Sequence, residues 1–318
     1  MITTVVGSYP SKAQEPQTIT EKLKNILGSY DPYKLAIKDA VYAQLNAGID
    51  IISDGQVRGD MIEIFAKDLP GMVIEDNTCK IKNQIRPSPK SIGATDLKYA
   101  NKLLEDFLKE SNLSPEEKEK KGVKGIITGP STMVFSSRFD GFYSMKQKDK
   151  AIIDMANALK EEAKTLEEAG AKYIQLDEPF LSTGMVNLNT AKKAINIISN
   201  EIKIPVAMHV CGDISNVLDQ LLKFKVDIID LEFAGIKSNL EILENQKSLN
   251  NKKIGFGSID TKKEIAEPID EIKTLIKKGV DILGHENMII DPDCGMKTLN
   301  PDVAKLKLKN MVEATKIF

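Results

Sequence analysis

The segment PVAMHVCGD at residues 205–213 carries the pattern that decides the fold, an apolar run that ends in chemically reactive side chains. Residues 205–208 are expected to form a buried strand because they are apolar and short. His209 and Cys211 follow one residue apart, so both side chains could turn toward one point where the strand becomes a loop. The segment DPDCG at 291–295 follows the apolar run 288–290 in the same way.

Runs of this kind alternate with helical stretches along the chain. Strands are expected at 3–6, 49–53, 125–128, 173–176, 205–208, 227–231, 253–258 and 288–290. Helices are expected at 32–47, 95–110, 148–169, 190–202, 215–224, 262–278 and 301–316. This alternation indicates an α/β protein, a (β/α)8 TIM barrel built from residues 1–318 as a single domain. The alternative, an open doubly wound sheet, lacks its usual glycine-rich phosphate turn after the first strand.

Residues 71–92 interrupt the alternation between strands and helices. They show no helical period and contain short alternating pieces such as 72–74 and 80–82. We therefore expect a β-hairpin inserted after the second strand. Cys79 lies in this segment and is expected to have no functional role.

Composition limits the function classes. The 318 residues include 44 Lys and Arg against 46 Asp and Glu, and this near-neutral balance predicts neither a nucleic-acid nor a membrane partner. Three cysteines do not suit a secreted disulfide framework. No apolar run approaches the roughly 20 residues of a membrane helix, and the N-terminus resembles a strand and not a signal peptide. The protein is expected to be cytoplasmic.

The C-terminal ends of barrel strands meet at one mouth, where active sites are built. The polar residues expected there are Gly7, Ser8, Gln56, Asp177, His209, Cys211, Glu232, Asp260 and Cys294. Imidazole, two thiolates and a carboxylate suit Zn²⁺, so a metal site is predicted. Its ligands would be His209, Cys211, Glu232 and Cys294. The alternative is that these are ordinary buried polar residues, but Cys294 lies in polar loop sequence.

The ligands would come from three strand ends, whereas a structural zinc site is usually formed by residues close in sequence. This difference favours a catalytic role for the metal. Zinc deprotonates a bound thiol, and it also lowers the pKa of bound water, which would make a hydrolase. Two sulfur ligands leave the metal less Lewis-acidic, which favours thiol alkylation. Asp177 could hold an ammonium group or cap a turn, and Asp260 could be a mouth carboxylate or a helix N-cap.

The motifs then resemble a known family. They are VVGSYP at 5–10, DGQVRGDM at 54–61, TGPST at 128–132, QLDEP at 175–179, HVC at 209–211, LE at 231–232 and DPDCGMKT at 291–298. The chain is similar to the catalytic C-terminal barrel of cobalamin-independent methionine synthase, and most closely to the short archaeal form that lacks the N-terminal barrel.

The resemblance implies transfer of a methyl group to the thiol of L-homocysteine, giving L-methionine, with one zinc ion per chain. It implies the same four zinc ligands, and a homocysteine site formed by Gly7, Ser8, Gln56 and Asp177. We take Asp177 and Asp260 as the catalytic carboxylates.

The departures from the family concern the methyl donor. The chain has no Trp to stack on a folate, and Ser258-Ile259-Asp260-Thr261-Lys262 replaces the segment that holds the family's proton-shuttling histidine. Gln56 stands where the long enzymes have Glu. The expected donor is therefore methylcobalamin or a methylated corrinoid protein, and not methyltetrahydrofolate. Methyl transfer to coenzyme M and a non-catalytic zinc carrier or chaperone remain as alternatives, and Asp177, a partner for an ammonium group, favours homocysteine over coenzyme M.

Overall fold

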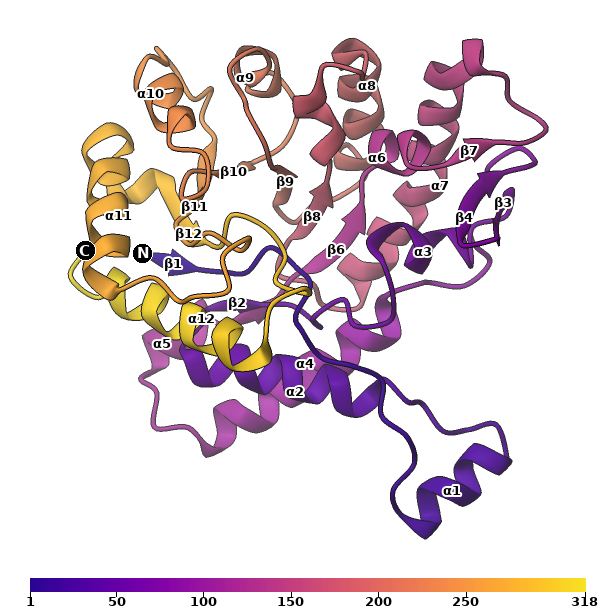
Figure 1. The fold of residues 1–318 in the computed structure, drawn as a ribbon, viewed down its shortest axis with the longest axis horizontal. Helices are drawn as coiled ribbons and strands as arrows, with labels where there is room; N and C mark the ends of the chain where they lie inside the picture. Colours follow the sequence, from indigo (N-terminus) through magenta and orange to yellow (C-terminus); the bar gives the residue numbers. More distant parts are fainter.

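The computed structural model describes residues 1–318, and it is an α/β fold with a curled parallel sheet (Figure 1). The main sheet has seven strands. In spatial order they are β1 (Ile2–Thr3), β12 (Met288–Asp291), β11 (Lys253–Gly257), β10 (Ile228–Glu232), β9 (Val206–Val210), β8 (Ile174–Asp177) and β6 (Gly125–Thr128). Every pairing among them is parallel, so their C-terminal ends all lie on one side.

The two outer strands of this sheet are linked through a short strand pair. Thr4, directly after β1, forms a parallel bridge with Ile51 of β2 (Ile51–Ile52). β2 pairs in parallel with β5 (Gly122–Val123), and only Lys124 separates β5 from β6. The C-terminal end of β2 therefore joins the polar strand ends of the main sheet.

The expected first strand, 3–6, is shorter in the structure because two carbonyl groups have side-chain partners. The Val5 carbonyl accepts a hydrogen bond from the Lys124 ammonium, and the Val6 carbonyl accepts one of 2.6 Å from Gln175 Nε2. These carbonyls are thereby turned toward the interior of the curled sheet. A ladder partner is not needed to satisfy them.

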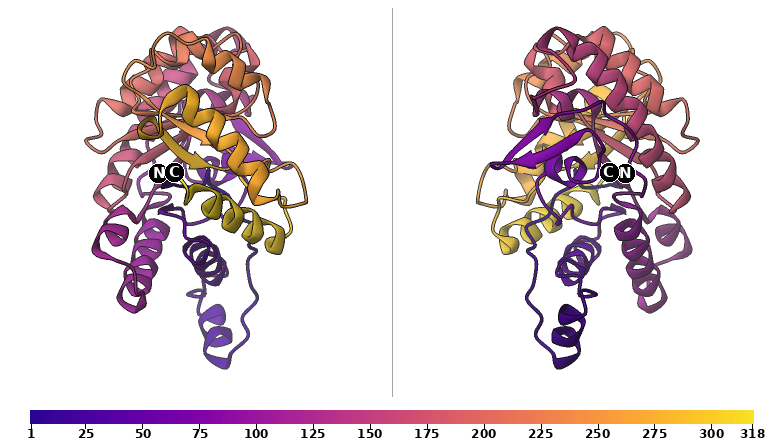
Figure 2. Two further views of the ribbon diagram at one scale, coloured as in Figure 1. Left: turned by 90° about the vertical axis from the view of Figure 1, so that its left-hand side faces the viewer. Right: turned by 90° about the vertical axis from the view of Figure 1, so that its right-hand side faces the viewer.

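Helices cover the outer face of the sheet (Figures 1 and 2). They are α2 (Lys34–Ala47), α4 (Ala94–Glu110), α5 (Pro115–Lys120), α7 (Lys148–Glu168), α8 (Leu188–Ser199), α9 (Leu218–Leu221), α10 (Ser238–Glu244), α11 (Ile269–Leu283) and α12 (Pro301–Thr315). Short helices α3 (Met61–Ala66) and α6 (Pro130–Phe135) lie in the loops after β2 and β6. Three single-turn segments are η1 (Met145–Gln147), η2 (Pro179–Thr183) and η3 (His285–Asn287). None of these helices is both long and apolar enough to cross a membrane.

Two expected helices begin later than the sequence indicated. The helix expected at 262–278 begins at Ile269, because Pro268 disfavours helical backbone in the residue before it. The helix expected at 215–224 is reduced to α9, since the preceding loop is held by a hydrogen bond of 3.2 Å from the Ile214 N–H to Asn239 Oδ1. Both changes leave a longer loop at a strand end.

A hairpin lies within the segment 71–92, where the sequence predicted one. Strands β3 (Met72–Glu75) and β4 (Thr78–Ile81) pair antiparallel, and β4 also pairs with β7 (Arg138–Phe139). Asp76 and Asn77 have φ of 51° and 54°, as expected for the two-residue turn of a tight hairpin. Cys79 is buried in this hairpin and lies outside the reactive group described below.

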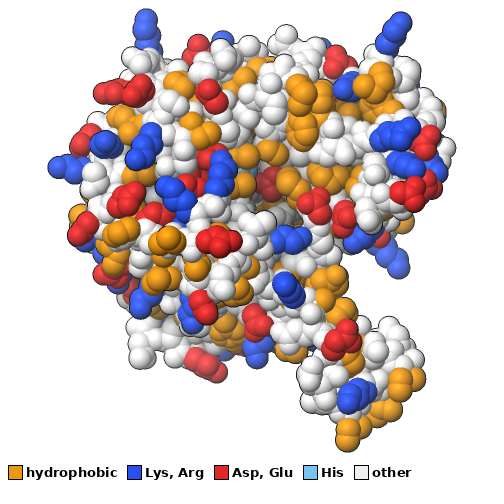
Figure 3. All heavy atoms as spheres, viewed as in Figure 1, with side chains coloured by type: hydrophobic (Ala, Val, Ile, Leu, Met, Phe, Trp, Pro, Cys, Tyr) orange, Lys and Arg blue, Asp and Glu red, His pale blue; other side chains and the backbone are white.

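Helix α1 (Ile19–Ile26) stands away from the rest of the molecule on an arm formed by residues 11–31 (Figures 1 and 2). A capping box between Thr18 and Glu21 fixes its first turn, and none of its residues is buried. Figure 3 shows apolar side chains at the outer end of the arm. The exposed apolar residues there are Ile19, Leu23, Ile26 and Leu27.

Candidate metal centre and substrate pocket

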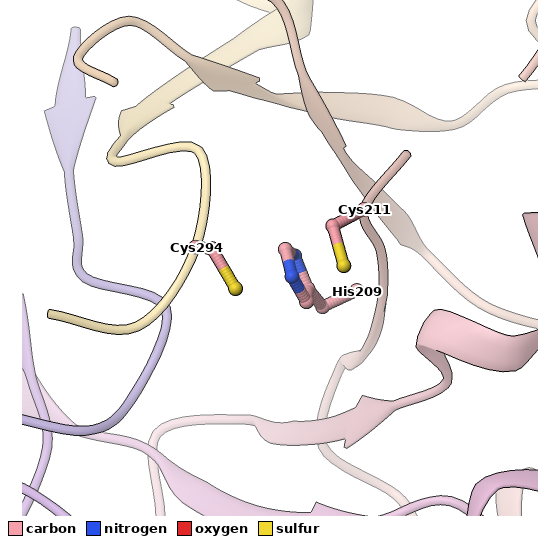
Figure 4. A group of neighbouring side chains, drawn as sticks. All are labelled: His209, Cys211 and Cys294. Atoms are coloured by element: carbon pink, nitrogen blue, oxygen red, sulfur yellow. The ribbon is translucent and has the colours of Figure 1, made fainter. Parts of the chain in front are cut away.

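Three reactive side chains meet at the C-terminal ends of two strands (Figure 4). His209 lies in β9, Cys211 follows that strand, and Cys294 follows β12. A nitrogen of His209 and the two sulfur atoms all lie within 4.8 Å of one another. Strands β10 and β11 separate β9 from β12 in the sheet, so it is the curl of the sheet that brings these residues together.

The group satisfies the chemical requirements of a zinc site. His209 is 2% exposed, and neither of its ring nitrogens has a hydrogen-bond partner. Buried polar atoms without partners are costly, and coordination of a metal by one nitrogen would remove that cost. Two sulfurs and one imidazole are ligands that zinc prefers. The three residues would thus hold zinc and leave a further coordination position free.

The two neighbouring thiols differ in acidity. Interaction with Cys211 lowers the pKa of Cys294, against the opposing effect of burial. Interaction with Cys294, together with burial, raises the pKa of Cys211. Burial alone would lower the pKa of His209, but Asp230 and both cysteines raise it well above its usual value. Metal binding must therefore displace protons from this group.

The structure leaves Glu232 outside the three-residue group. This carboxylate, at the end of β10, is 1% exposed. Its Oε1 accepts a hydrogen bond of 2.6 Å from Lys262 Nζ, and its Oε2 accepts one of 3.1 Å from the Gly212 N–H. The expected fourth ligand is therefore held by a lysine beside the site.

A pocket of about 260 Å³ opens beside the three ligands. Its lining includes Ser8, Gln56, Asp177 and Lys297 together with His209 and Cys294. The volume suits a ligand the size of an amino acid. Polar groups and two cysteine side chains therefore line a cavity of this size.

Two glycines allow the loops around this pocket to approach closely. A β-carbon on Gly7 would lie 2.6 Å from Gln56 Oε1, and one on Gly295 would lie 2.2 Å from Ser8 Oγ. Gln56 itself has a φ of 43°, which is uncommon for a residue other than glycine. Gly7 therefore supports the pocket through its contact with Gln56, although it does not itself line the pocket.

Of the two neighbouring carboxylates at the end of β8, only Asp177 lines the pocket. Asp177 Oδ1 accepts a hydrogen bond of 2.7 Å from Gln175 Nε2, and burial raises the pKa of Asp177 to about 6. Glu178 turns the other way and accepts hydrogen bonds from the N–H groups of Ser131 and Thr132 at the start of α6. Glu178 is therefore committed to positioning the loop after β6.

Asp260, which was expected at the same opening as Asp177, does not line this pocket. It lines a different pocket of about 730 Å³ between α10 and α11. Its Oδ1 accepts a hydrogen bond of 2.9 Å from the Lys262 N–H, and its Oδ2 lies 3.3 Å from Lys263 Nζ. Asp260 thus closes a turn in the loop after β11, which is closer to the alternative of a capping residue.

A buried cluster of charged residues near His209 was not predicted from the sequence. Asp230 of β10 and Asp291 of β12 flank Gly255 of β11, where a β-carbon would lie within 2.9 Å of both side chains. Lys124 balances these carboxylates, and burial lowers the pKa of Lys124 to about 8. The signal in the sequence was a lone carboxylate inside each apolar strand, because a charged residue there needs a partner.

Comparisons with known proteins agree with this geometry. The model of the family described as cobalamin-independent synthase, catalytic domain, matches residues 1–317. The chain is 54% identical over 314 residues to a methionine synthase from Methanothermobacter thermautotrophicus, covering 99% of each protein. It is 45% identical to a methionine synthase from Methanocaldococcus jannaschii, covering 100% of this chain and 99% of that one.

A solved structure shows the same fold. It is a B12-independent methionine synthase from Shewanella sp. W3-18-1 in complex with selenomethionine, with a TM-score of 0.80 at 24% identity. The match covers 99% of this chain and 96% of the other. The fold and site define a methyltransferase enzyme of the α/β class with a candidate metal centre. The chain belongs to the cobalamin-independent methionine synthase family, as a catalytic domain.

Proposed function

We propose that the protein transfers a methyl group to the thiol of L-homocysteine to give L-methionine, using one zinc ion held by His209, Cys211 and Cys294. The observation that carries this proposal is that these three residues lie close together in the lining of a small pocket that Asp177 also lines. We also propose that the curled sheet is a (β/α)8 barrel and that residues 1–318 form one domain. Near-neutral charge and three free cysteines support a cytoplasmic location without a nucleic-acid partner.

The lining of the pocket supports homocysteine as the substrate. The Asp177 carboxylate is the natural partner for the ammonium group, because a charge-assisted hydrogen bond is strong where water is excluded. The Gly7-Ser8 turn offers backbone N–H groups to the carboxylate, and Gln56 also lines the pocket. The substrate sulfur would then face Cys211 and Cys294.

Zinc, when bound, lowers the pKa of a thiol so that the sulfur is an anion at neutral pH. The anionic sulfur forms a bond to the methyl carbon as the bond between that carbon and the donor breaks, and the donor keeps the electron pair of the broken bond. Asp177 and Ser8 hold the amino-acid end of the substrate during this step and so aim the sulfur. Asp260 contributes by ordering the loop that carries Lys262.

The proposed methyl donor is methylcobalamin or a methylated corrinoid protein. The absence of Trp and the segment Ser258–Lys262 after β11 support this choice over methyltetrahydrofolate, since no indole and no histidine is present there. Transfer to coenzyme M is the second candidate. Asp177 disfavours it, because coenzyme M has no ammonium group to pair with this buried carboxylate.

A rival-substrate assay tests the proposal. Zinc-loaded protein would be given methylcobalamin or methyltetrahydrofolate, with homocysteine or coenzyme M as acceptor, and the product identified by mass spectrometry. Methionine formed from methylcobalamin is the expected result, with no product from Cys294→Ser. Methylated coenzyme M as the main product, or turnover in the absence of metal, would contradict it.

A further inference from the structure

The loop after β11 is held rigidly on its inner side. The Asp260 N–H donates a hydrogen bond of 2.9 Å to Glu267 Oε1, and the Asp260 carbonyl accepts one of 3.0 Å from Lys307 Nζ. The turn closed by the Asp260 carboxylate then directs the next residues of the loop. Lys262 therefore leaves a fixed backbone position near the metal centre.

The Lys262 side chain is 67% exposed, yet its ammonium reaches a carboxylate that is only 1% exposed. The contact with Glu232 Oε1 is 2.6 Å, and it raises the pKa of Lys262. The other oxygen of Glu232 is held by the N–H of Gly212, the residue after Cys211. Glu232 is thus kept beside the metal ligands and apart from them.

We propose that Lys262 is a positioning residue that competes with the bound metal for Glu232 and so keeps one position of the site free for the substrate sulfur. This inference rests on the proposed function of the same site. In this role Lys262, which follows β11, controls whether Glu232 pairs with the lysine ammonium or binds the metal.

The charges support this competition. Zinc with two thiolates and a neutral imidazole carries no net charge, so the Glu232 carboxylate or a substrate thiolate brings the site to minus one. If both anions were bound at once, the net charge of the metal and its ligands would be minus two. Such a charge is unfavourable in a poorly solvated environment. The Lys262 ammonium removes this penalty because it pairs with the buried carboxylate that the metal releases.

Because Lys262 is exposed, the return of Glu232 from Lys262 to the metal also has a low free-energy cost. When Glu232 turns to the metal, the ammonium can extend into water, where it is well hydrated. A fully buried lysine would lack this second state. The alternative is that Lys262 forms an exposed ion pair with a negligible effect on the metal site, since many surface ion pairs contribute little.

The test compares Lys262→Met with Lys263→Met, a neighbouring exposed lysine that contacts Asp260 and not Glu232. Zinc affinity would be measured by chelator competition, and homocysteine affinity of the zinc-loaded protein by calorimetry without any methyl donor. Lys262→Met should bind zinc about tenfold more tightly and homocysteine about tenfold more weakly. Lys263→Met should match the parent in both. Equal behaviour of the two variants would overturn the inference.

A second variant separates this effect from a change in folding. In a Glu232→Gln background, Lys262→Met should change neither affinity further, because the two residues act through one contact. Additive effects in the double variant would also overturn the inference. If the zinc-loaded parent binds no homocysteine, the proposed function itself fails. If the parent binds homocysteine and Lys262→Met does not differ from it, only the role of Lys262 fails.

Discussion

Nδ1 of His209 lies 3.1 Å from Oδ1 of Asp230, and both side chains are 3% exposed. The two residues are register partners in the parallel pair β9–β10, so the backbone itself sets this approach. The Asp230 carboxylate thus lies beside Nδ1, and a carboxylate in that position fixes which nitrogen of a metal-binding histidine coordinates the metal. Nε2 is then the nitrogen that a metal would use.

Asp230→Asn should therefore weaken zinc binding by about 10- to 100-fold, as loss of a carboxylate behind a histidine ligand usually does. Chelator competition at fixed pH would measure the change. Asp219→Asn, on the exposed side of α9, serves as a control and should bind zinc like the parent. An unchanged affinity in Asp230→Asn would show that the contact has no part in metal binding.

Asp177→Asn should stabilise the metal-free fold while weakening homocysteine binding. Burial raises the pKa of Asp177 from 3.8 to about 6, so the folded state keeps this proton to higher pH than the unfolded chain. The wild type therefore loses stability as pH rises from about 4 to 6, by about 3 kcal/mol at most, and the variant does not.

Denaturant unfolding at several pH values checks this prediction. The two proteins should be equally stable below pH 4, and the variant should be the more stable one at pH 7. Asp213→Asn should show no such gain, because hydrogen bonds from Ser215 lower the pKa of that exposed residue. A gap between parent and Asp177→Asn that is independent of pH would contradict the assignment.

Lys307→Met should lower the free energy of unfolding by about 3–5 kcal/mol, because it leaves a buried carboxylate without its partner. Lys307 is 0% exposed and its ammonium lies 2.7 Å from Glu267 Oε2. Lys305→Met, on the exposed face of the same helix, is the matched control and should change stability little. The prediction fails if both variants unfold at the same denaturant concentration.

Arg58→Met should release the arm that carries α1. The Arg58 guanidinium donates a hydrogen bond of 2.6 Å to Asp31 at the end of the arm, and also binds Asp96 of α4. Limited trypsin digestion should then cut faster at Lys22 and Lys24, which lie on the exposed helix. Arg138→Met removes an exposed arginine without these contacts and should digest like the parent. Equal digestion of both variants would mean that other contacts hold the arm.

The sequence contained enough information to place His209, Cys211 and Cys294 together. Each follows or ends an apolar run, and parallel strands bring such ends to one side. The same logic placed Asp260 at the shared opening, and its side chain does not line the pocket beside the ligands. A strand end fixes where a loop begins, but local contacts, here the hydrogen bond that Asp260 accepts from the Lys262 N–H, decide which way the side chain points.

Contacts between residues far apart in sequence were beyond such reasoning. The bonds of Lys124 and Gln175 to the Val5 and Val6 carbonyls shorten the first strand, and no apolar pattern signals them. The pairing of Glu232 with Lys262 is equally hidden, because an exposed lysine in a loop looks like ordinary surface. Helix α1 was missed for another reason, since none of its residues contributes to the core that periodicity reveals.

The ligands on β9 and β12 come from opposite parts of the sheet and are joined only once the whole sheet has curled. An ion bound between them needs the complete sheet, so it binds the folded chain and finds no equivalent site in a partly folded one. Its binding energy adds directly to resistance against unfolding. Chelation should consequently lower the melting temperature of the whole chain, and reloading with metal after refolding would count the molecules that have completed their assembly.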